Sequence, residues 1–160
     1  MGFIKCNVGF SWSPYHQRAG ASWLVRDSSG KALYHARRAF FGITSSHHAS
    51  MSAFAWASEA MADLKLDRVL MEVSTGMIRQ VLNHPESFMY LSDLVERSNV
   101  AALRFSSCRL QMVPTTCNTL VMEIAESVTR DRRWESYVAT HGPAWLEPRI
   151  RQEASTTTFA

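Results

Sequence analysis

Residues 3–40 have the sequence FIKCNVGFSWSPYHQRAGASWLVRDSSGKALYHARRAF, and this stretch decides the fold. Its first part alternates as a β-strand does, with Ile4, Cys6 and Val8 on one face. Proline in one connection and an Asp-Ser-Ser-Gly run in the next are typical of tight turns. In chain order, the predicted strands are residues 3–10, 19–27 and 31–40, and the predicted turns are residues 13–16 and 27–30. We therefore expect an antiparallel meander of three strands.

The rest of the chain alternates predicted helices and strands. A helix is expected to start at the Thr44-Ser45-Ser46 run, because Ser and Thr are favoured N-cap residues. Further elements are predicted as strand 67–74, helices 75–83 and 88–98, strand 103–113, and a helix marked by Leu120, Val121, Ile124, Ala125 and Val128. Beyond Arg133 we expect the chain to fray. A meander followed by alternating helices and strands indicates an α/β protein with a mixed sheet.

Composition indicates one globular domain. The chain has 160 residues, of which 46% are hydrophobic and 19% are charged. It has no apolar run of the roughly 18 residues that a membrane span needs, and no secretory signal is visible. The odd number of cysteines (three) favours reduced thiols. We expect an intracellular protein, cytoplasmic or nuclear, without a membrane partner; the sequence does not predict an oligomeric state.

Basic residues are concentrated in the first third of the chain. Residues 1–50 contain six Lys or Arg and a single acidic residue, Asp27, whereas residues 51–125 contain six basic and eight acidic residues. This distribution fits either a solvated sheet face or a surface that faces a polyanion.

Six short stretches, in their order and spacing, resemble one family. They are residues 4–8, 19–27, 35–40, 56–61, 127–131 and 136–140. Together they resemble the RNase H type-1 domains of plant non-LTR retrotransposon reverse transcriptases and their stand-alone relatives. The resemblance implies an RNase H-like domain over residues 1–146, with a frayed tail over 147–160, and a five-stranded mixed sheet in the order 3-2-1-4-5 with helices on both faces. We expect a detached module of such a reverse transcriptase.

Active members of that family cut the RNA strand of an RNA–DNA hybrid with two Mg²⁺ ions. Four carboxylates hold the two metal ions, because Mg²⁺ prefers charged oxygen ligands. The two ions sit about 4 Å apart. Counted from the family's motifs, the corresponding positions hold Gly9, Ser50, Ser74 and Met122. The resemblance therefore implies that all four catalytic acids have been replaced.

Nearby acids are poor substitutes for the missing four. Glu72 shares a strand face with Ser74 but lies roughly 6.6 Å along the strand, and we expect it to pair with a basic side chain or to cap a polar pocket. Glu59 and Glu123 are predicted to be solvated helix acids. The His47-His48 pair lacks any accompanying metal-binding motif. We therefore expect no resident metal or cofactor.

Nucleic-acid binding is separable from cleavage in this family. Ser50 and Ser74 are neutral donors that fit a phosphate oxygen. The other candidate contacts are Arg37 and Arg38 in the basic N-terminal part, and Arg130, Arg132 and Arg133 beside Trp134. Arg130, Arg132 and Arg133 also fit cations at the C-terminal end of a helix, where the helix dipole favours positive charge.

Three hypotheses follow. The first is a catalytically inactive RNase H-like module that binds RNA–DNA hybrid or RNA without needing Mg²⁺. The second is a protein-interaction module or relic that keeps only the fold, with an apolar patch around Trp12, Trp134 or Trp145. The third is a residual ribonuclease that relies on Glu72 and an unforeseen metal site.

Overall fold

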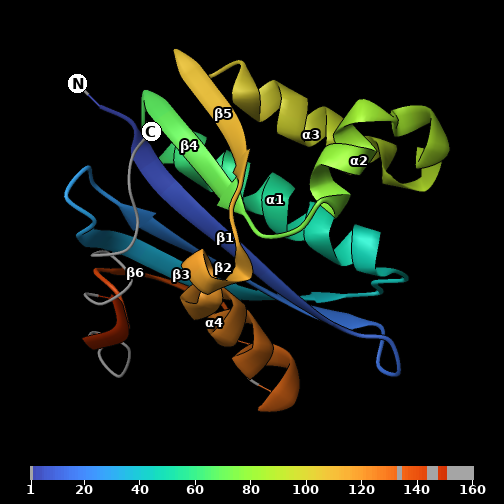
Figure 1. Ribbon diagram of the computed structural model, residues 1–160. Coiled ribbons are helices and arrows are strands. Elements are labelled where there is room, and N and C mark those ends of the chain that lie inside the picture. The colour runs from blue at the N-terminus through green and yellow to red at the C-terminus, as the bar shows by residue number, and fades with distance from the viewer. Residues whose placement is uncertain (1, 133–134, 144–147, 151–160) are drawn as a thin grey trace.

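The predicted meander forms the centre of the molecule (Figure 1). This computed structural model describes residues 2–132, 135–143 and 148–150. The three strands, β1 (Ile4–Ser13), β2 (Arg18–Arg26) and β3 (Ala32–Phe41), pair antiparallel in sequence. Asp27 closes the β2–β3 turn, because its Oδ1 accepts from the backbone N–H groups of Ser29 and Lys31. Gly30 has the positive φ of 86° that this turn requires.

The later elements extend the sheet on both sides and cover its faces. They are α1 (Ser46–Asp63), β4 (Arg68–Val73), α2 (Met77–Asn83), α3 (Ser92–Ala102), β5 (Ser107–Met112), α4 (Thr119–Arg130) and β6 (Tyr137–Thr140), with 3-10 turns at Pro85–Ser87, Met89–Leu91 and Thr115–Cys117. β4 pairs parallel with β1, and β5 pairs parallel with β4. No helix in the described residues is both long and apolar enough to span a membrane.

In the described residues the sheet has six strands, so the prediction of five strands was wrong. Its order is β5-β4-β1-β2-β3-β6, which keeps the predicted 3-2-1-4-5 arrangement and adds β6 antiparallel to β3. The expectation that the chain frays after Arg133 was therefore wrong for the segment that forms β6. An unpaired β3 would expose a row of backbone donors and acceptors, and the β6 ladder satisfies them.

Two predicted boundaries also shift. The helix expected over residues 88–98 becomes a 3-10 turn followed by α3, which continues to Ala102 because Ala101 is buried on its inner side. β5 consequently starts at Ser107 rather than at Leu103. Its start is set by the carbonyl of Asp67, which accepts from the N–H groups of Ser106 and Ser107 where β4 begins.

The main core lies between the sheet and α1. α1 begins where Ser45 caps it by accepting a 3.0 Å hydrogen bond from His48 N. The helix buries Met51, Phe54 and Met61 against Trp23 and its neighbours, and α3 packs on the outer side of α1. This sheet face, here called the α1 face, carries Cys6 and Val8 of β1, as the alternation predicted.

The opposite face, here called the α4 face, is covered by α4 over β1, β2 and β3 (Figure 1). Small residues let the helix approach very closely: a Cβ on Gly20 would lie 2.1 Å from the carbonyl oxygen of Ala125. Ser22 donates its hydroxyl hydrogen to the carbonyl of Val121. The close approach fixes where the first turns of α4 lie over β1.

Candidate functional site

The first and last of the four acid positions lie against each other. Gly9 stands on the α4 face of β1, and an ideal Cβ built on it would lie 2.5 Å from the carbonyl carbon and oxygen of Val121 and 2.8 Å from the nitrogen of Met122. Real Cβ atoms essentially never come within 3.0 Å of such backbone atoms. The α4 backbone therefore occupies the space that any side chain at position 9 would need.

Ser74 joins this region through Asn118, whereas Ser50 does not. Asn118 Nδ2 donates to Val8 O at 2.8 Å and to Ser74 Oγ at 3.2 Å, so it links the end of β4 to β1. The buried Ser50 hydroxyl donates instead to His47 O within its own helix, at 3.0 Å. The hydroxyl groups of both serines therefore take part in hydrogen bonds within the protein.

These residues do not fit the magnesium ions of active relatives. None of the four positions supplies a charged oxygen, and the space over Gly9 is filled by backbone. In the part of the chain that the structure describes, no group of three or more His, Cys, Asp or Glu is placed to hold a metal ion. No metal-dependent step follows from this geometry.

A cluster of buried polar side chains lies next to these positions, and we call it the buried ion cluster: Lys5, Asn7, Arg26, Glu72 and Asn118. Lys5 Nζ lies 3.7 Å from Glu72 Oε1, and Asn7 Nδ2 donates to the same oxygen at 3.2 Å. Asn7 also donates to Asn118 Oδ1 at 3.3 Å and accepts from Arg26 Nε at 3.3 Å. Each member is at most 1% exposed, so the cluster is sealed from water.

Burial dominates the electrostatics of this cluster. Burial raises the pKa of Glu72, an effect that the nearby Lys5 ammonium opposes, and burial lowers the pKa of Lys5. Arg26 also acts on both groups, since its positive charge lowers the pKa of Lys5 and of Glu72. The prediction that Glu72 pairs with a basic side chain is confirmed. The Glu72 carboxylate is thus held by Lys5 and Asn7.

The two helix acids also have partners. Glu59 accepts a 2.5 Å hydrogen bond from Arg97 Nη2 of α3, and Glu123 forms an ion pair with Arg149. The Glu59 and Glu123 side chains are 39% and 35% exposed, so both acids are partly solvated and also ion-paired, which the prediction of solvated acids did not include. Both carboxylates stabilise contacts between elements.

Arg37 and Arg38 do not form one patch, because neighbouring residues in a strand point to opposite faces. Arg37 stands beside Ser22 on the α4 face, where its guanidinium stacks over Tyr137 at 4.8 Å and donates to Glu135 O at 3.4 Å. Arg38 lies on the α1 face and stacks over Phe40 at 4.6 Å.

Arg130 and Arg132 lie at the end of α4 and are exposed. Arg130 pairs with Asp131 at 3.2 Å. Because Arg132 precedes Glu135 by three residues, the chain keeps it within about 11 Å of the backbone that Arg37 contacts. We call Arg37, Arg130 and Arg132 the α4–β6 basic group. The remaining predicted contact, Arg133, lies outside the described residues.

A scan against protein-family models supplies the relationship. The model of the reverse transcriptase-like family matches residues 7–128, which span β1 to α4. The chain belongs to the reverse transcriptase-like family. A search of curated proteins gave no match.

Solved RNase H structures have the same fold as this reverse transcriptase-like domain. RNase H1 from Halobacterium salinarum superposes with a TM-score of 0.73 at 17% identity, over 81% of this chain and 99% of that one. The N-terminal RNase H domain of Rv2228c from Mycobacterium tuberculosis gives 0.68 at 14% identity, over 80% and 94%. LC11-RNase H1, solved in complex with an RNA/DNA hybrid, gives 0.66 at 14% identity, over 81% and 98%. At such identities the likeness establishes the RNase H-like fold.

Sequence reasoning missed Lys5 and Arg26 as members of the site of this reverse transcriptase-like domain. Both were counted among the basic residues of the N-terminal segment, and charged residues are rarely buried. One available signal was the position of Lys5, Asn7 and Gly9 on the same face of β1. In the structure α4 covers that face.

Proposed function

We propose that this chain is a catalytically degenerate RNase H-like domain, of the kind found in plant non-LTR retrotransposon reverse transcriptases, that has kept the capacity to bind RNA–DNA hybrid or RNA. The observation that carries the proposal is the α4 backbone lying over Gly9. It leaves no room for the first-strand carboxylate, and the other three acid positions hold Ser50, Ser74 and Met122. Two Mg²⁺ ions need several carboxylates, so cleavage by the family's mechanism has no support in these residues.

Binding has independent support. A fold neighbour was solved with an RNA/DNA hybrid, and the fold is retained here without the carboxylates that would repel phosphate. The α4–β6 basic group presents guanidiniums at the α4 face: Arg130 and Arg132 are exposed, and Arg37 is half-buried. Guanidiniums bind phosphate oxygens well because their N–H groups form a planar fork.

Fluorescence anisotropy of an RNA–DNA hybrid labelled on its RNA strand tests the proposal. We expect anisotropy to rise with protein concentration equally in Mg²⁺ and in EDTA, and affinity to fall as salt increases. A flat titration at low salt would contradict binding. A later fall of anisotropy that occurs only with Mg²⁺ would mean that the RNA strand is cut, and would contradict degeneracy.

Arg37 and Arg38 provide a matched pair of variants. Each is a half-buried arginine of β3 stacked on an aromatic ring, but the two lie on opposite faces. Arg37→Ala should weaken binding and lower the slope of log affinity against log salt by about 1, because one phosphate contact is lost. Arg38→Ala removes the same charge and should leave the slope unchanged. Equal effects from the two variants would show that the α4 face is not the binding face.

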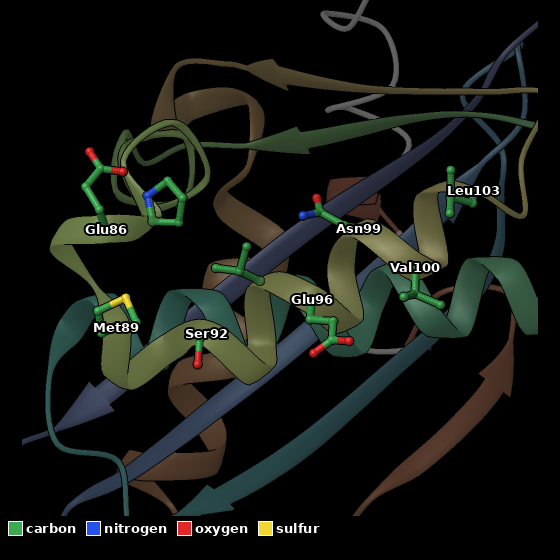
Figure 2. Close-up of a pocket in the computed structure, with 9 residues that line it drawn as sticks. Glu86, Met89, Ser92, Glu96, Asn99, Val100 and Leu103 are labelled. Carbon is green, nitrogen blue, oxygen red and sulfur yellow. The ribbon is translucent and has the colours of Figure 1, made fainter.

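An apolar groove on α3 favours a second candidate function, protein interaction (Figure 2). The groove is about 590 Å³ and lies between α3 and the 3-10 turns before it. Met89 and Leu103 are 69% and 85% exposed, and Glu86 and Glu96 place carboxylates on the lining. This charge complements a basic amphipathic helix of a partner protein. The predicted patch is elsewhere: Trp12 is half-buried and donates to Ile43 O at 3.2 Å, and Trp134 and Trp145 lie outside the described residues.

A synthetic Leu/Lys amphipathic peptide tests the groove. It should bind the wild-type protein more tightly than its Leu/Glu counterpart does, and Met89→Ser/Leu103→Ser should abolish the difference. Tyr15→Ser, which alters a residue that is 91% exposed elsewhere, serves as the control. Equal binding of both peptides would exclude the groove as a site for basic helices.

A further inference from the structure

Two arginines stack on one phenylalanine on the β4–β5 side of the α4 face. The guanidinium carbons of Arg68 and Arg109 lie 4.4 and 5.0 Å from the centre of the Phe3 ring. Phe3 directly precedes β1, Arg68 begins β4, and Arg109 lies in β5 beside Leu70. The parallel pairing of β1, β4 and β5 therefore brings the three side chains to one place.

A third arginine reaches the same place from α2. Arg79 Nη2 donates to Leu110 O of β5 at 2.9 Å, and this bond uses one of the five N–H donors of its guanidinium. A hollow of about 480 Å³ lies here, lined by Phe3, Leu70, Arg79, Arg109, Gln111 and Met112, with Leu110 completing it. Among the described residues that line the hollow, none carries a carboxylate. We call Arg68, Arg79 and Arg109 around Phe3 the β5-edge arginine cluster.

This cluster is separate from the α4–β6 basic group. β5 and β6 are the two opposite edges of the sheet, and β5 is four strand positions from β3, which carries Arg37 (Figure 1). At about 4.8 Å per strand, the two basic surfaces are roughly 19 Å apart. α4 packs on β1, β2 and β3, so it lies away from β4 and β5.

We propose that the β5-edge arginine cluster is a second anion-binding surface, which takes phosphate groups of a nucleic-acid backbone. Cation–π attraction to the Phe3 ring offsets part of the repulsion between the neighbouring Arg68 and Arg109. Stacking also holds Arg109 in place, so less side-chain entropy is lost when its N–H groups bind phosphate oxygens. The hollow gives the phosphate a place beside them.

Two basic surfaces at opposite sheet edges make the domain bivalent for nucleic acid. One molecule would then hold two strands, or two segments of one long strand. The β5-edge surface does not depend on the α4–β6 basic group, so the proposed hybrid binding and this second surface can fail separately.

The test uses the full chain and a labelled single-stranded RNA oligonucleotide. Arg79→Gln/Arg109→Gln removes two exposed guanidiniums, and Lys31→Gln/Arg38→Gln removes the same charge far from β5. The β5-edge variant should lose at least about tenfold in affinity, and its slope of log affinity against log salt should fall by about 1.4, for two phosphate contacts. The control variant should behave as the wild type does. Phe3→Leu, which keeps apolar packing but removes the ring, should weaken binding in the same direction.

NMR of the wild-type protein gives a readout that does not depend on how a variant folds. Addition of the oligonucleotide should shift the Nε–Hε signals of Arg79 and Arg109, and should leave that of Arg104, which is paired with Asp63, in place. The absence of shifts at Arg79 and Arg109 would overturn the proposal. Equal affinity of the β5-edge and control variants would overturn it too, whether or not the hybrid binds.

Competition with inorganic tripolyphosphate distinguishes the phosphates of a nucleic-acid backbone from a free polyphosphate as the ligand of this surface. If the nucleic-acid backbone is the ligand, longer oligonucleotides should bind more tightly and tripolyphosphate should compete only weakly. Tight binding of tripolyphosphate without any effect of oligonucleotide length would overturn the backbone assignment. If Arg37→Ala loses hybrid binding but still binds single-stranded RNA, the α4–β6 basic group and the β5-edge arginine cluster bind separately, and this result would support both.

Discussion

At Gly9, the first strand and the last long helix approach each other backbone to backbone. The residue has an ordinary extended conformation, so the constraint there is space and not φ. Helix atoms of Val121 and Met122 lie where a Cβ would stand. A glycine at this position therefore allows α4 to seat on the sheet, and a carboxylate at the same position would displace the helix.

Gly9→Ala should consequently destabilise the protein. Overpacking costs about 1–3 kcal/mol where neighbours can give way, and the neighbour here is helix backbone, so we expect the upper end of that range. Gly76→Ala is the matched control, because a Cβ on Gly76 meets nothing within 4 Å and its φ of −80° suits alanine. Urea unfolding measures both, and an equal free energy of unfolding for the two variants would contradict the close approach at Gly9.

The two buried cations should respond differently to replacement by methionine. Arg26 donates to Asn7 Oδ1, Gly30 O and Ile150 O, so Arg26→Met leaves three buried acceptors without this donor and should cost about 3 kcal/mol or more. Lys5→Met should lower the free energy of unfolding by less, because burial already disfavours the charged form of Lys5. In this variant Glu72 still accepts from Asn7 and still has the positive charge of Arg26 nearby. Chemical denaturation at pH 7 gives both values. A larger loss for Lys5→Met would show that the Lys5–Glu72 pair dominates the cluster.

Among the elements, β6 shows how a four-residue strand is held at an edge. Besides its ladder with β3, it is tied by His35, whose Nε2 lies 3.1 Å from the Tyr137 hydroxyl and whose Nδ1 meets His141 O. The strand also carries the ring on which Arg37 stacks. The position of β6 thus sets the geometry of the α4–β6 basic group.

Acid should weaken this attachment. Burial lowers the pKa of His35 below its usual 6.5, and the positive charge of Arg37 acts in the same direction, whereas the His141 carbonyl opposes it. The unfolded chain therefore binds a proton at His35 more readily than the folded chain does. The free energy of unfolding should fall as the pH drops below about 6.5, by no more than about 1.4 kcal/mol for each pH unit.

Urea unfolding at pH 7.5 and 5.5, together with hydrogen exchange of the β6 amides, measures this dependence. His35→Asn should reduce the difference between the two pH values, whereas His84→Asn, at an exposed position, should leave it unchanged. A difference that persists fully in His35→Asn would assign the pH effect to other groups.

On the scale of the whole molecule, the acid positions and the charged surfaces are arranged by the sheet. The order β5-β4-β1-β2-β3-β6 places Gly9 near the middle, the α4–β6 basic group toward one edge and the β5-edge arginine cluster at the other. The distribution favours contact with phosphate along the α4 face, while the groove on α3 lies on the other side of the sheet.

Placing acids at the four positions should not create a nuclease. We expect the combined variant Gly9→Asp, Ser50→Glu, Ser74→Asp and Met122→Asp to leave the RNA strand of a hybrid intact in Mg²⁺, because the α4 backbone prevents the first carboxylate from reaching its place. The same variant with Gly9 kept is the control, and circular dichroism checks folding of both. Cleavage by the four-acid variant that EDTA abolishes would show that α4 can move aside.

Much of the fold could be predicted because its signals are local. The alternation in β1, the Asp27–Gly30 turn, the Ser45 cap and the stripe of α4 each depend on residues close in the chain, and all four are confirmed. β6 was missed because a strand of four residues carries little periodic signal, and only pairing with β3 makes these residues a strand.

The sequence by itself determined the α/β class and the meander, since these depend on residue type and short-range periodicity. The family resemblance, and not periodicity, singled out Gly9, Ser50, Ser74 and Met122, none of which carries a carboxylate. Only the tertiary structure decided that α4 fills the space over Gly9 and that Lys5 and Arg26 are buried. It alone brought Phe3 together with Arg109, because strand register and helix packing join residues that are far apart in the chain. Such contacts depend on how whole elements pack, and no local pattern encodes them.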